Sequence, residues 1–359
     1  MKSNVLLIYT GGTIGMNRNA LTGALEPFDF DELMLRVPEL SELPTGIGVH
    51  CFDPPIDSSD MTPALWAQLA NIIAGRYLDY DGFVILHGTD TMAYTASALS
   101  FMLEGLNKPV ILTGSQLPLC QLRTDGKENV VTSIEIASAC HPDGTARVPE
   151  VCIYFSGHLM RGNRTTKQSA EDFNAFESFN YPHLADAGVN IIYHDEAILK
   201  PLSTLPSPPA SHPSPLTSHP SPLTPSVSGL DDSVIIVSLF PGMRDDFIRH
   251  IIAAPRLRSI VLRTYGSGNA PHSPSLLSAL REGTQMGKVI VNVSQCLSGS
   301  VEMSRYDAGR QLQEAGVISA RDATVEATVT KLMYLQARYD DHSLIRQFMQ
   351  RSIRGEVTE

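Results

Sequence analysis

The chain has 359 residues, with 27 lysines and arginines against 38 aspartates and glutamates, and a formal net charge of -11 at pH 7. At roughly 150 residues per domain, this length predicts two domains, each able to bury a core. The composition, 43% apolar and 18% charged, is typical of globular proteins and excludes a collagen-like or globally disordered chain. The acidic surplus repels phosphate backbones and argues against nucleic acid as a partner.

The N-terminal segment and the cysteines predict a cytoplasmic protein. The apolar run Val5–Tyr9 stops at Thr10-Gly11-Gly12, so it is shorter than the roughly 7 to 15 apolar residues of a signal peptide. No apolar stretch approaches the roughly 20 residues of a membrane span, so we expect no membrane association. Widely spaced cysteines without a Cys-x-x-Cys pair favour free thiols over a disulfide framework or a zinc site. They are Cys51, Cys120, Cys140, Cys152 and Cys296.

Short apolar runs alternate with segments of helical periodicity in the first 200 residues. The predicted strands are Asn4–Tyr9, Gly82–Leu86, Pro109–Leu112 and Val151–Phe155. The predicted helices are Pro63–Arg76, with Asp60 or Thr62 as its N-cap, and Thr91–Leu106. Continuous apolar strands that alternate with helices favour a mostly parallel sheet with helices on both faces.

Residues 201–225 differ from the rest of the chain. Eighteen of these 25 positions are Pro, Ser or Thr, none is charged, and Ser211–Thr217 repeats as Ser218–Thr224. Such a segment cannot bury enough apolar area to offset its ordering entropy, and its nine prolines argue against a helix or a central strand. We interpret it as an extended linker, with a proline-rich docking ligand as the alternative.

The alternation resumes after this segment and predicts a second, smaller α/β domain. Its predicted elements are the strands Ser233–Leu239, Ser259–Arg263 and Lys288–Val293 and the helices Asp245–Ala254, Ser275–Gly287, Ala308–Ala315 and Ala323–Arg338. The predicted fold is therefore α/β, with a larger N-terminal, mostly parallel sheet flanked by helices. The domain boundaries are 1–200, a linker at 201–230, and 231–359.

Three segments that follow predicted strands carry groups suited to catalysis. In Thr10–Gly15 the glycines allow close backbone approach, and the segment could hold a nucleophilic threonine, form a tight turn before a helix, or bind phosphate. It lacks both the Walker A lysine and the dinucleotide spacing, so phosphate binding is disfavoured. The segment Gly82–Met92 places Thr89 beside Asp90, although Asp90 could simply cap the next helix. Lys167 ends the third segment and could be an ordinary surface charge.

Taken together, these segments resemble a known family. Residues 8–15, Ile-Tyr-Thr-Gly-Gly-Thr-Ile-Gly, and residues 82–92 match both signature motifs of the bacterial-type asparaginase/glutaminase family. The resemblance covers nearly the whole chain except the Pro/Ser/Thr-rich segment, and it is strongest to the cytoplasmic type I L-asparaginases. It continues through Asp57–Met61, Thr113–Gln116, Gly162–Lys167 and Tyr265–Pro271.

The resemblance implies hydrolysis of L-asparagine through a covalent acyl-enzyme. Thr13 would attack the side-chain amide, expel ammonia and leave an aspartyl ester for water to cleave. A threonine hydroxyl needs a base within hydrogen-bond reach, and the family's second triad corresponds to Thr89, Lys167 and Asp90. We expect a buried Lys167 that is easily neutral. Either threonine could act first, and we favour Thr13. Backbone amides near Thr89 would stabilise the oxyanion.

The resemblance also implies how the free amino acid is held. Ser58 and Ser59 would bind the α-carboxylate, while Asp90 and Asp57 would receive the α-ammonium. Asp57 could equally belong to a helix N-cap. Ser115 would line the pocket near the scissile amide through its carbonyl. No metal and no cofactor is expected.

Two further sets of residues follow from the family pattern. Many members carry a tyrosine in the loop after the first motif, but Leu21–Pro27 holds none, so Tyr306 is a candidate replacement, from the same or a neighbouring subunit. Type I members also bind asparagine at a regulatory site. The matching positions here are Arg263, Ser294, Gln295 and Cys296, with an internal ion pair of Arg263 as the alternative.

The predicted function is therefore an L-asparaginase, and the family pattern predicts a homotetramer built from two dimers, with the Gly266–Pro271 loop near a neighbour's pocket. A glutaminase or an ammonia-supplying amidotransferase subunit is the nearest alternative; the latter would need an additional N-terminal domain before the first motif. A non-catalytic amino-acid sensor would be expected to lose Thr13, Thr89 or Lys167, and all three are present.

Overall fold

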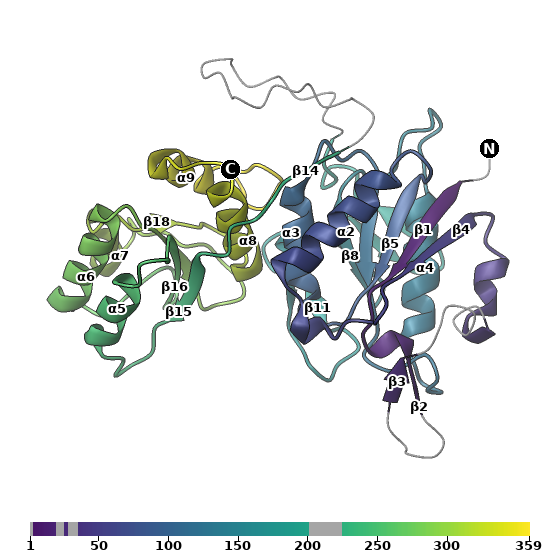
Figure 1. Cartoon of the computed structure of the whole chain (residues 1–359), viewed down its shortest axis with the longest axis horizontal. Helices are drawn as coiled ribbons and strands as arrows, with labels where there is room; N and C mark the ends of the chain where they lie inside the picture. Colours follow the sequence, from purple (N-terminus) through teal and green to yellow (C-terminus); the bar gives the residue numbers. More distant parts are fainter. Residues whose placement is uncertain (1–2, 19–24, 28–34, 201–224) are drawn as a thin grey trace. The chain divides into compact units, whose positions relative to one another are not determined.

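The computed structural model describes residues 3–18, 25–27, 35–200 and 225–359, so most of the predicted linker lies outside the described residues (Figure 1). The chain divides into two compact units. The first consists of Met1–Ser178 and Pro182–Val227, and the second of Phe179–Tyr181 and Ser228–Glu359. Within the described residues, no helix is both long enough and apolar enough to cross a bilayer.

The first unit is built on an eight-stranded mixed sheet in the order β13-β12-β9-β8-β7-β5-β1-β4. Neighbours from β4 to β8 are parallel, whereas β9, β12 and β13 are each antiparallel to the preceding strand. The strands of the sheet are β1 (Asn4–Tyr9), β4 (Gly46–Cys51), β5 (Gly82–Leu86), β7 (Val110–Thr113), β8 (Val151–Phe155), β9 (His158–Arg161), β12 (Ala185–Ala187) and β13 (Ile191–Tyr193). The predicted parallel arrangement is thus confirmed for the strands β4, β1, β5, β7 and β8. The antiparallel edge formed by β9, β12 and β13 was not predicted.

Helices bury both faces of this sheet. All five residues of β5 and of β8 are buried, as expected for strands covered on two sides. Figure 1 shows α2 and α3 on one side of the sheet and α4 on the other. The helices are α2 (Pro63–Gly75), α3 (Met92–Met102) and α4 (Gly126–Ser138), with short 3-10 turns η1 (Thr13–Gly15), η2 (Pro38–Ser41), η3 (Ser58–Asp60) and η4 (Gly162–Arg164).

The structure decides between the two predicted caps of α2 and corrects the end of α3. The cap of α2 is Thr62, whose hydroxyl accepts from the Leu65 amide at 3.4 Å. Helix α3 ends at Met102 rather than Leu106, because Leu103–Glu104 forms β6 and pairs with Ser226–Val227, strand β14. The remaining two-stranded pairs are β2 (Met16–Arg18) with β3 (Leu25–Pro27) and β10 (Thr166–Lys167) with β11 (Phe176–Glu177).

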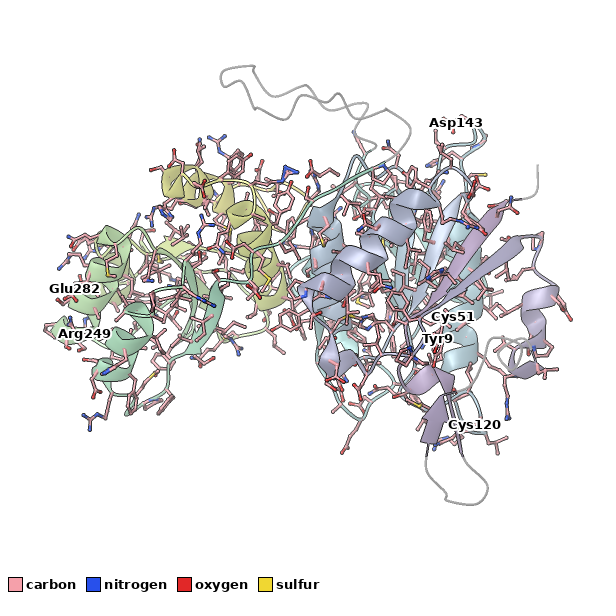
Figure 2. All side chains as sticks on the ribbon, in the orientation of Figure 1. Tyr9, Cys51, Cys120, Asp143, Arg249 and Glu282 are labelled. Atoms are coloured by element: carbon pink, nitrogen blue, oxygen red, sulfur yellow. The ribbon has the colours of Figure 1, made fainter. Side chains whose placement is uncertain are left out.

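The second unit is a smaller parallel sheet in the order β15-β16-β17-β18, and the predicted second α/β domain is confirmed. Its apolar core packs the sheet against the helices, and Arg249 of α5 forms an ion pair with Glu282 of α6 on the surface (Figure 2). The strands are β15 (Val234–Ser238), β16 (Ser259–Thr264), β17 (Val289–Ser294) and β18 (Ile318–Ser319). The helices are α5 (Asp245–Ile252), α6 (Pro274–Gln285), α7 (Asp307–Glu314), α8 (Val325–Gln336) and α9 (His342–Met349).

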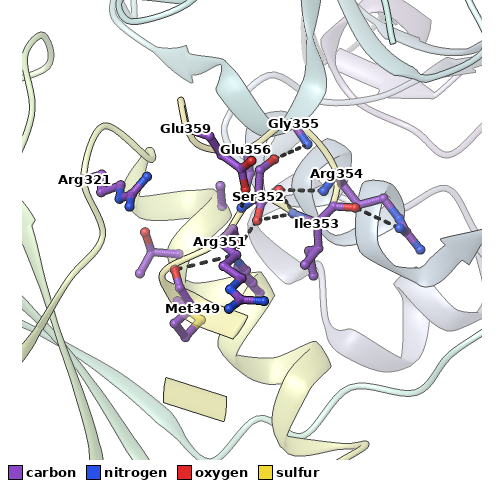
Figure 3. Close-up of polar contacts among 12 residues, drawn as sticks. Arg321, Met349, Arg351, Ser352, Ile353, Arg354, Gly355, Glu356 and Glu359 are labelled. Atoms are coloured by element: carbon purple, nitrogen blue, oxygen red, sulfur yellow. Dashed lines mark hydrogen bonds and ion pairs between the residues drawn. The ribbon is translucent and has the colours of Figure 1, made fainter. Parts of the chain in front are cut away.

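The C-terminal segment is held by a buried ion pair that the sequence did not predict. Lys331 of α8 lies 2.5 Å from Glu356, and the two side chains are 2% and 0% exposed. Lys331 also donates to the carbonyls of Arg351 and Met349, and Glu356 accepts from the amides that precede it (Figure 3). Every polar group of the pair therefore has a partner, as burial of charge requires.

Candidate active site

The first two signature motifs meet at the carboxyl ends of β1 and β5. The Thr10 amide and hydroxyl both donate to the Leu86 carbonyl, at 3.0 and 2.9 Å. Beyond this point Gly12 has a φ of +91°, and a Cβ atom on it would lie only 2.5 Å from the Cα of Gly88. Only glycine allows this approach. It brings the segment with Thr13 against the segment with Thr89.

A third loop completes the contact. The Ile56 amide donates to the Thr10 carbonyl at 2.7 Å, and a Cβ atom on Gly88 would lie 2.5 Å from the Ser58 hydroxyl. The Thr91 hydroxyl donates to the Ser58 carbonyl at 2.6 Å. Residues 56–59 therefore pack against both the loop with Thr13 and the loop with Thr89. These three loops, which follow the parallel strands β1, β5 and β4, therefore meet at one edge of the sheet.

Asp57 shapes this third loop. Its carboxylate accepts from the Ser59 amide at 2.9 Å and from the Ser59 hydroxyl at 2.6 Å, and it caps η3. These hydrogen bonds from Ser59 hold the pKa of the Asp57 carboxyl below its ordinary value. Asp57 is thus an N-cap residue, but of η3 and not of the predicted helix that begins at Pro63, whose cap is Thr62. Its exposure leaves the carboxylate open to a ligand as well.

Lys167 joins the predicted triad. Its ammonium donates to the Thr89 hydroxyl and to an Asp90 carboxylate oxygen, both at 2.8 Å. Strand β10 holds the lysine, because Lys167 pairs with Phe176 of β11. The lysine is partly rather than fully buried, since its side chain keeps 19% of its surface exposed, whereas that of Asp90 keeps 68%. It lies on the two-residue strand β10 and not on a strand of the main sheet.

Gln116 is a site residue that sequence reasoning missed. The Thr89 hydroxyl donates to Oε1 of Gln116 at 3.3 Å, and Nε2 of Gln116 donates to the Asp172 carbonyl at 3.1 Å. The backbone N–H of Gln116 donates to the Asp125 carboxylate at 3.0 Å, which fixes the loop. Ser115, the predicted residue beside it, is buried and donates its hydroxyl to the Leu117 carbonyl at 2.6 Å. The motif Thr113–Gln116 contained the signal, but its last residue was given no role.

Within the described residues, the Thr13 hydroxyl has no hydrogen bond to a base. Thr13 begins η1 and is half-buried, and no hydrogen bond joins its side chain to the part of the chain that the structure describes. Its turn is held by the Tyr9 hydroxyl, which donates to the Gly15 carbonyl at 3.2 Å. Tyr9 lies beside Cys51 at the ends of β1 and β4 (Figure 2), and burial together with Cys51 raises the pKa of Tyr9 to about 12. A neutral phenol therefore supports the threonine turn.

A buried hydrogen-bonded chain lies behind Thr89. The Trp66 indole donates to the Thr95 hydroxyl at 2.9 Å, and this hydroxyl lies 2.9 Å from Nε2 of His87. The Gly88 carbonyl can only accept, so Nδ1–H of His87 donates to it at 2.7 Å, and Nε2 of the neutral ring accepts from the Thr95 hydroxyl. Burial lowers the pKa of His87 to about 4. A neutral imidazole thus fixes the peptide that precedes Thr89.

Comparison with known proteins agrees with this geometry. The family model "Asparaginase, N-terminal" matches residues 4–199, and the model "Glutaminase/Asparaginase C-terminal domain" matches residues 233–349. The chain belongs to the asparaginase/glutaminase family. L-asparaginase 1 of Escherichia coli K12 is 44% identical, covering 99% of this chain and 98% of that protein. L-asparaginase I of Vibrio cholerae superposes with a TM-score of 0.84 at 39% identity and covers both chains fully.

These two relatives confirm the predicted resemblance to type I members of the family. The family also contains proteins under other names. The mouse 60 kDa lysophospholipase is 37% identical over 99% of this chain and 62% of its own length. Family membership therefore establishes the fold and the class of site, and the choice of substrate needs a separate argument.

The remaining predicted residues lie in the second unit. Tyr306 is 49% exposed, precedes α7 and has the Arg305 guanidinium 5.5 Å from its ring. The four predicted regulatory positions lie together where β16 and β17 end. The Gln295 side chain donates to the Arg263 carbonyl at 3.0 Å, and the Cys296 amide donates to the Ser294 hydroxyl at 2.9 Å. Arg263 has a buried Nε atom without a hydrogen-bond partner among the described residues.

Proposed function

We propose that this protein hydrolyses L-asparagine to L-aspartate and ammonia through a threonine acyl-enzyme. The observation that carries the proposal is the Lys167 ammonium, 2.8 Å from both the Thr89 hydroxyl and Asp90. A hydroxyl between a lysine and an amide oxygen is suited to move protons during attack on a carbonyl. The stacked glycines Gly12 and Gly88 set this group beside the Thr13 turn.

The reaction has two steps. The Thr13 oxygen forms a bond to the side-chain amide carbon of asparagine, its proton passes to the departing nitrogen, and ammonia leaves. Water then attacks the aspartyl ester, its proton returns to the Thr13 oxygen, and L-aspartate leaves. Thr89 and Lys167 relay the protons, or activate the water in the second step. Thr89 and Asp90 immediately precede α3, whose N-terminal end carries partial positive charge and favours the oxyanion.

The α-carboxylate and α-ammonium groups of asparagine are complementary to polar groups of residues 57–59 and to Asp90. Ser58 and Ser59 offer hydroxyls and amides to the α-carboxylate, and the exposed carboxylates of Asp57 and Asp90 receive the α-ammonium. Ser115 contributes its carbonyl near the scissile amide, because its hydroxyl is engaged with Leu117. No step requires a metal ion or a cofactor. We expect Tyr306 to assist Thr13, and the Arg263 cluster to bind asparagine as a regulator.

The decisive experiment is a steady-state assay of ammonia release from asparagine and from glutamine, with wild-type protein and Thr13→Ala. We expect a higher kcat/KM on asparagine and a fall in kcat of about 1,000-fold or more in the variant, as loss of a covalent nucleophile produces. A Thr13→Ser variant, which keeps a hydroxyl, is the matched control and should keep much more activity.

Two outcomes would replace the proposal. A kcat/KM on glutamine that exceeds the value on asparagine would make the protein a glutaminase. Retention of more than about a tenth of wild-type turnover in Thr13→Ala would remove Thr13 from its role. A lysophospholipid should not be hydrolysed, because the loops around Thr89 gather polar groups and not an apolar surface.

Localisation and assembly belong to the same proposal. Widely spaced cysteines favour a cytoplasmic protein, and none of the five, all of which lie within the described residues, forms a disulfide. We expect a homotetramer built from two dimers, with Gly266–Pro271 near a neighbour's site. Light scattering of the purified protein tests the assembly. The segment 201–230 serves as a linker between the two domains in this proposal.

A further inference from the structure

A second group of functional side chains lies in the first unit, apart from the loops described above. It gathers His158 of β9, Asp186 of β12, and His183, which lies two residues before β12. One oxygen of Asp186 lies 2.8 Å from Nδ1 of His158 and 3.0 Å from Nδ1 of His183. The three ligand atoms all lie within 4.8 Å of one another. Zinc bonds of about 2.0 to 2.1 Å in a tetrahedron separate ligand atoms by about 3.4 Å, so small shifts would suit an ion.

Glu177 and His194 form hydrogen bonds with two of the three proposed ligands. Nε2 of His183 lies 3.0 Å from Oε1 of Glu177, and Nε2 of His194 lies 2.9 Å from the second oxygen of Asp186. A metal-binding histidine commonly donates its other ring nitrogen to a carboxylate, which fixes the ring and its tautomer. Glu177 and His194 provide such support to a ligand on each side.

The hydrogen-bond geometry of His183 points the same way. Both of its ring nitrogens face carboxylate oxygens, Nδ1 that of Asp186 and Nε2 that of Glu177. A neutral imidazole has one N–H and one lone pair. A cation bound between the Nδ1 lone pair and Asp186 would leave Nε2–H to donate to Glu177, so that both ring nitrogens would have a partner.

We propose that His158, His183 and Asp186 bind one zinc ion, with water as a fourth ligand, in a structural site. Imidazole nitrogens select zinc or a similar transition metal over magnesium and calcium, which prefer oxygen alone. The ligand side chains are half-buried, so the ion can enter from solvent. Sequence analysis predicted no metal, because the ligands come from segments 25 residues apart and have no recognisable spacing.

The place of the site in the fold gives the ion a mechanical role. Glu177 belongs to β11 and pairs with Thr166 of β10, the residue before Lys167. His158 of β9 and Asp186 of β12 would bind the ion together with His183, and His183 is hydrogen-bonded to Glu177 of β11. The ion would therefore stabilise the position of the short β10–β11 pair relative to the main sheet. The ion takes no part in the hydrolysis proposed above, and its test does not depend on that reaction.

The test uses full-length protein that is stripped with a chelator, dialysed and titrated with Zn²⁺ in a calorimeter. We expect one zinc ion per chain and a higher Tm with zinc, as binding to the folded state requires. His183→Gln should weaken zinc affinity by more than 100-fold and abolish the Tm shift. Glu177→Gln removes only a supporting carboxylate and should weaken affinity by about 10- to 100-fold.

The matched control is His250→Gln, because His250 is an exposed histidine on α5 outside the cluster. It should bind zinc as the wild type does. X-ray absorption of the zinc-loaded wild type should show two imidazoles and no sulfur, which excludes the free cysteines as ligands. This measurement needs no variant and therefore stands if His183→Gln fails to fold. Absence of zinc binding, sulfur ligation, or equal affinity in Glu177→Gln and the wild type would overturn the proposal.

Discussion

The two units each contain a lysine paired with a carboxylate, and the two pairs differ in almost every physical respect. Lys167 and Asp90 are 2.8 Å apart and keep 19% and 68% of their side-chain surface exposed. Lys331 and Glu356 are 2.5 Å apart and keep 2% and 0%. Burial lowers the pKa of Lys331, although Glu356 acts in the opposite direction.

The partners of the two ammonium groups explain the difference. Lys331 donates to one carboxylate and two carbonyls, so its three N–H donors are all engaged. Lys167 engages two partners in the described part of the chain, a hydroxyl and a carboxylate, which leaves one donor for a ligand. A saturated buried pair stabilises the fold, whereas an unsaturated half-exposed pair can take part in chemistry.

Replacing Lys167 gives the largest expected effect among the tests of the contrast between the Lys167–Asp90 and Lys331–Glu356 pairs. Lys167→Met keeps much of the side-chain volume but removes the charge and the contact with Thr89. We expect kcat on asparagine to fall by about 1,000-fold or more with a small change in KM, because proton transfer is lost and substrate contacts remain. Steady-state kinetics measures both constants.

The same variant should barely change stability, since an exposed ion pair contributes about 0 to 1 kcal/mol. Urea unfolding provides this control. An effect on KM alone would make Lys167 a group that positions substrate, and a large loss of stability would contradict its contrast with Lys331.

Glu356→Gln tests the other half of the comparison. It leaves Lys331 as an uncompensated buried charge, so the free energy of unfolding should fall by about 3 to 5 kcal/mol. Urea unfolding of the full chain measures this. The double variant Lys331→Met, Glu356→Gln removes the stranded charge and should recover part of the loss. If the single and double variants were equally destabilised, the buried charge would not be the cause.

The buried His87 gives the stability of the first unit a pH dependence. Its pKa is about 4 in the folded protein against 6.5 ordinarily, so the unfolded state binds more protons between these values. Stability should therefore be unaffected above pH 7 and fall as the pH decreases from 6.5 to 4, by about 3 kcal/mol in total. His87→Gln retains an acceptor for Thr95 and should flatten this part of the profile. An unchanged slope in His87→Gln, measured against His250→Gln, would contradict the assignment.

The sequence predicted those parts of the fold and site that are local in the chain. Asn4–Tyr9 and Gly82–Leu86 are continuous apolar runs, and the structure has both as strands with the same bounds. Thr89 and Asp90 were found because they directly follow such a strand. The role of Gln116 and the partly buried position of Lys167 were not predicted, since they depend on which segments lie beside one another.

Ion pairs and clusters between distant segments were the least predictable features. Lys331 and Glu356 are 25 residues apart and have no sequence pattern in common, and α9 between them was not predicted. The ligands of the histidine cluster likewise meet only through the pairing of β9 with β12. Antiparallel pairing at the sheet edge joins such segments, and periodicity along one strand carries no information about it.

The smallest expected effect concerns the Pro/Ser/Thr-rich segment, which lies outside the described residues and outside both pairs. Deleting one copy of its repeat, Ser218–Thr224, shortens a predicted linker of 30 residues, 201–230, by seven. Loop-closure entropy changes by only about 0.6 kcal/mol for each doubling of length, so kcat and oligomeric state should stay within about twofold of the wild type. Kinetics and light scattering measure both. A large loss of activity in protein that is still folded by circular dichroism would show that the segment does more than connect the two domains.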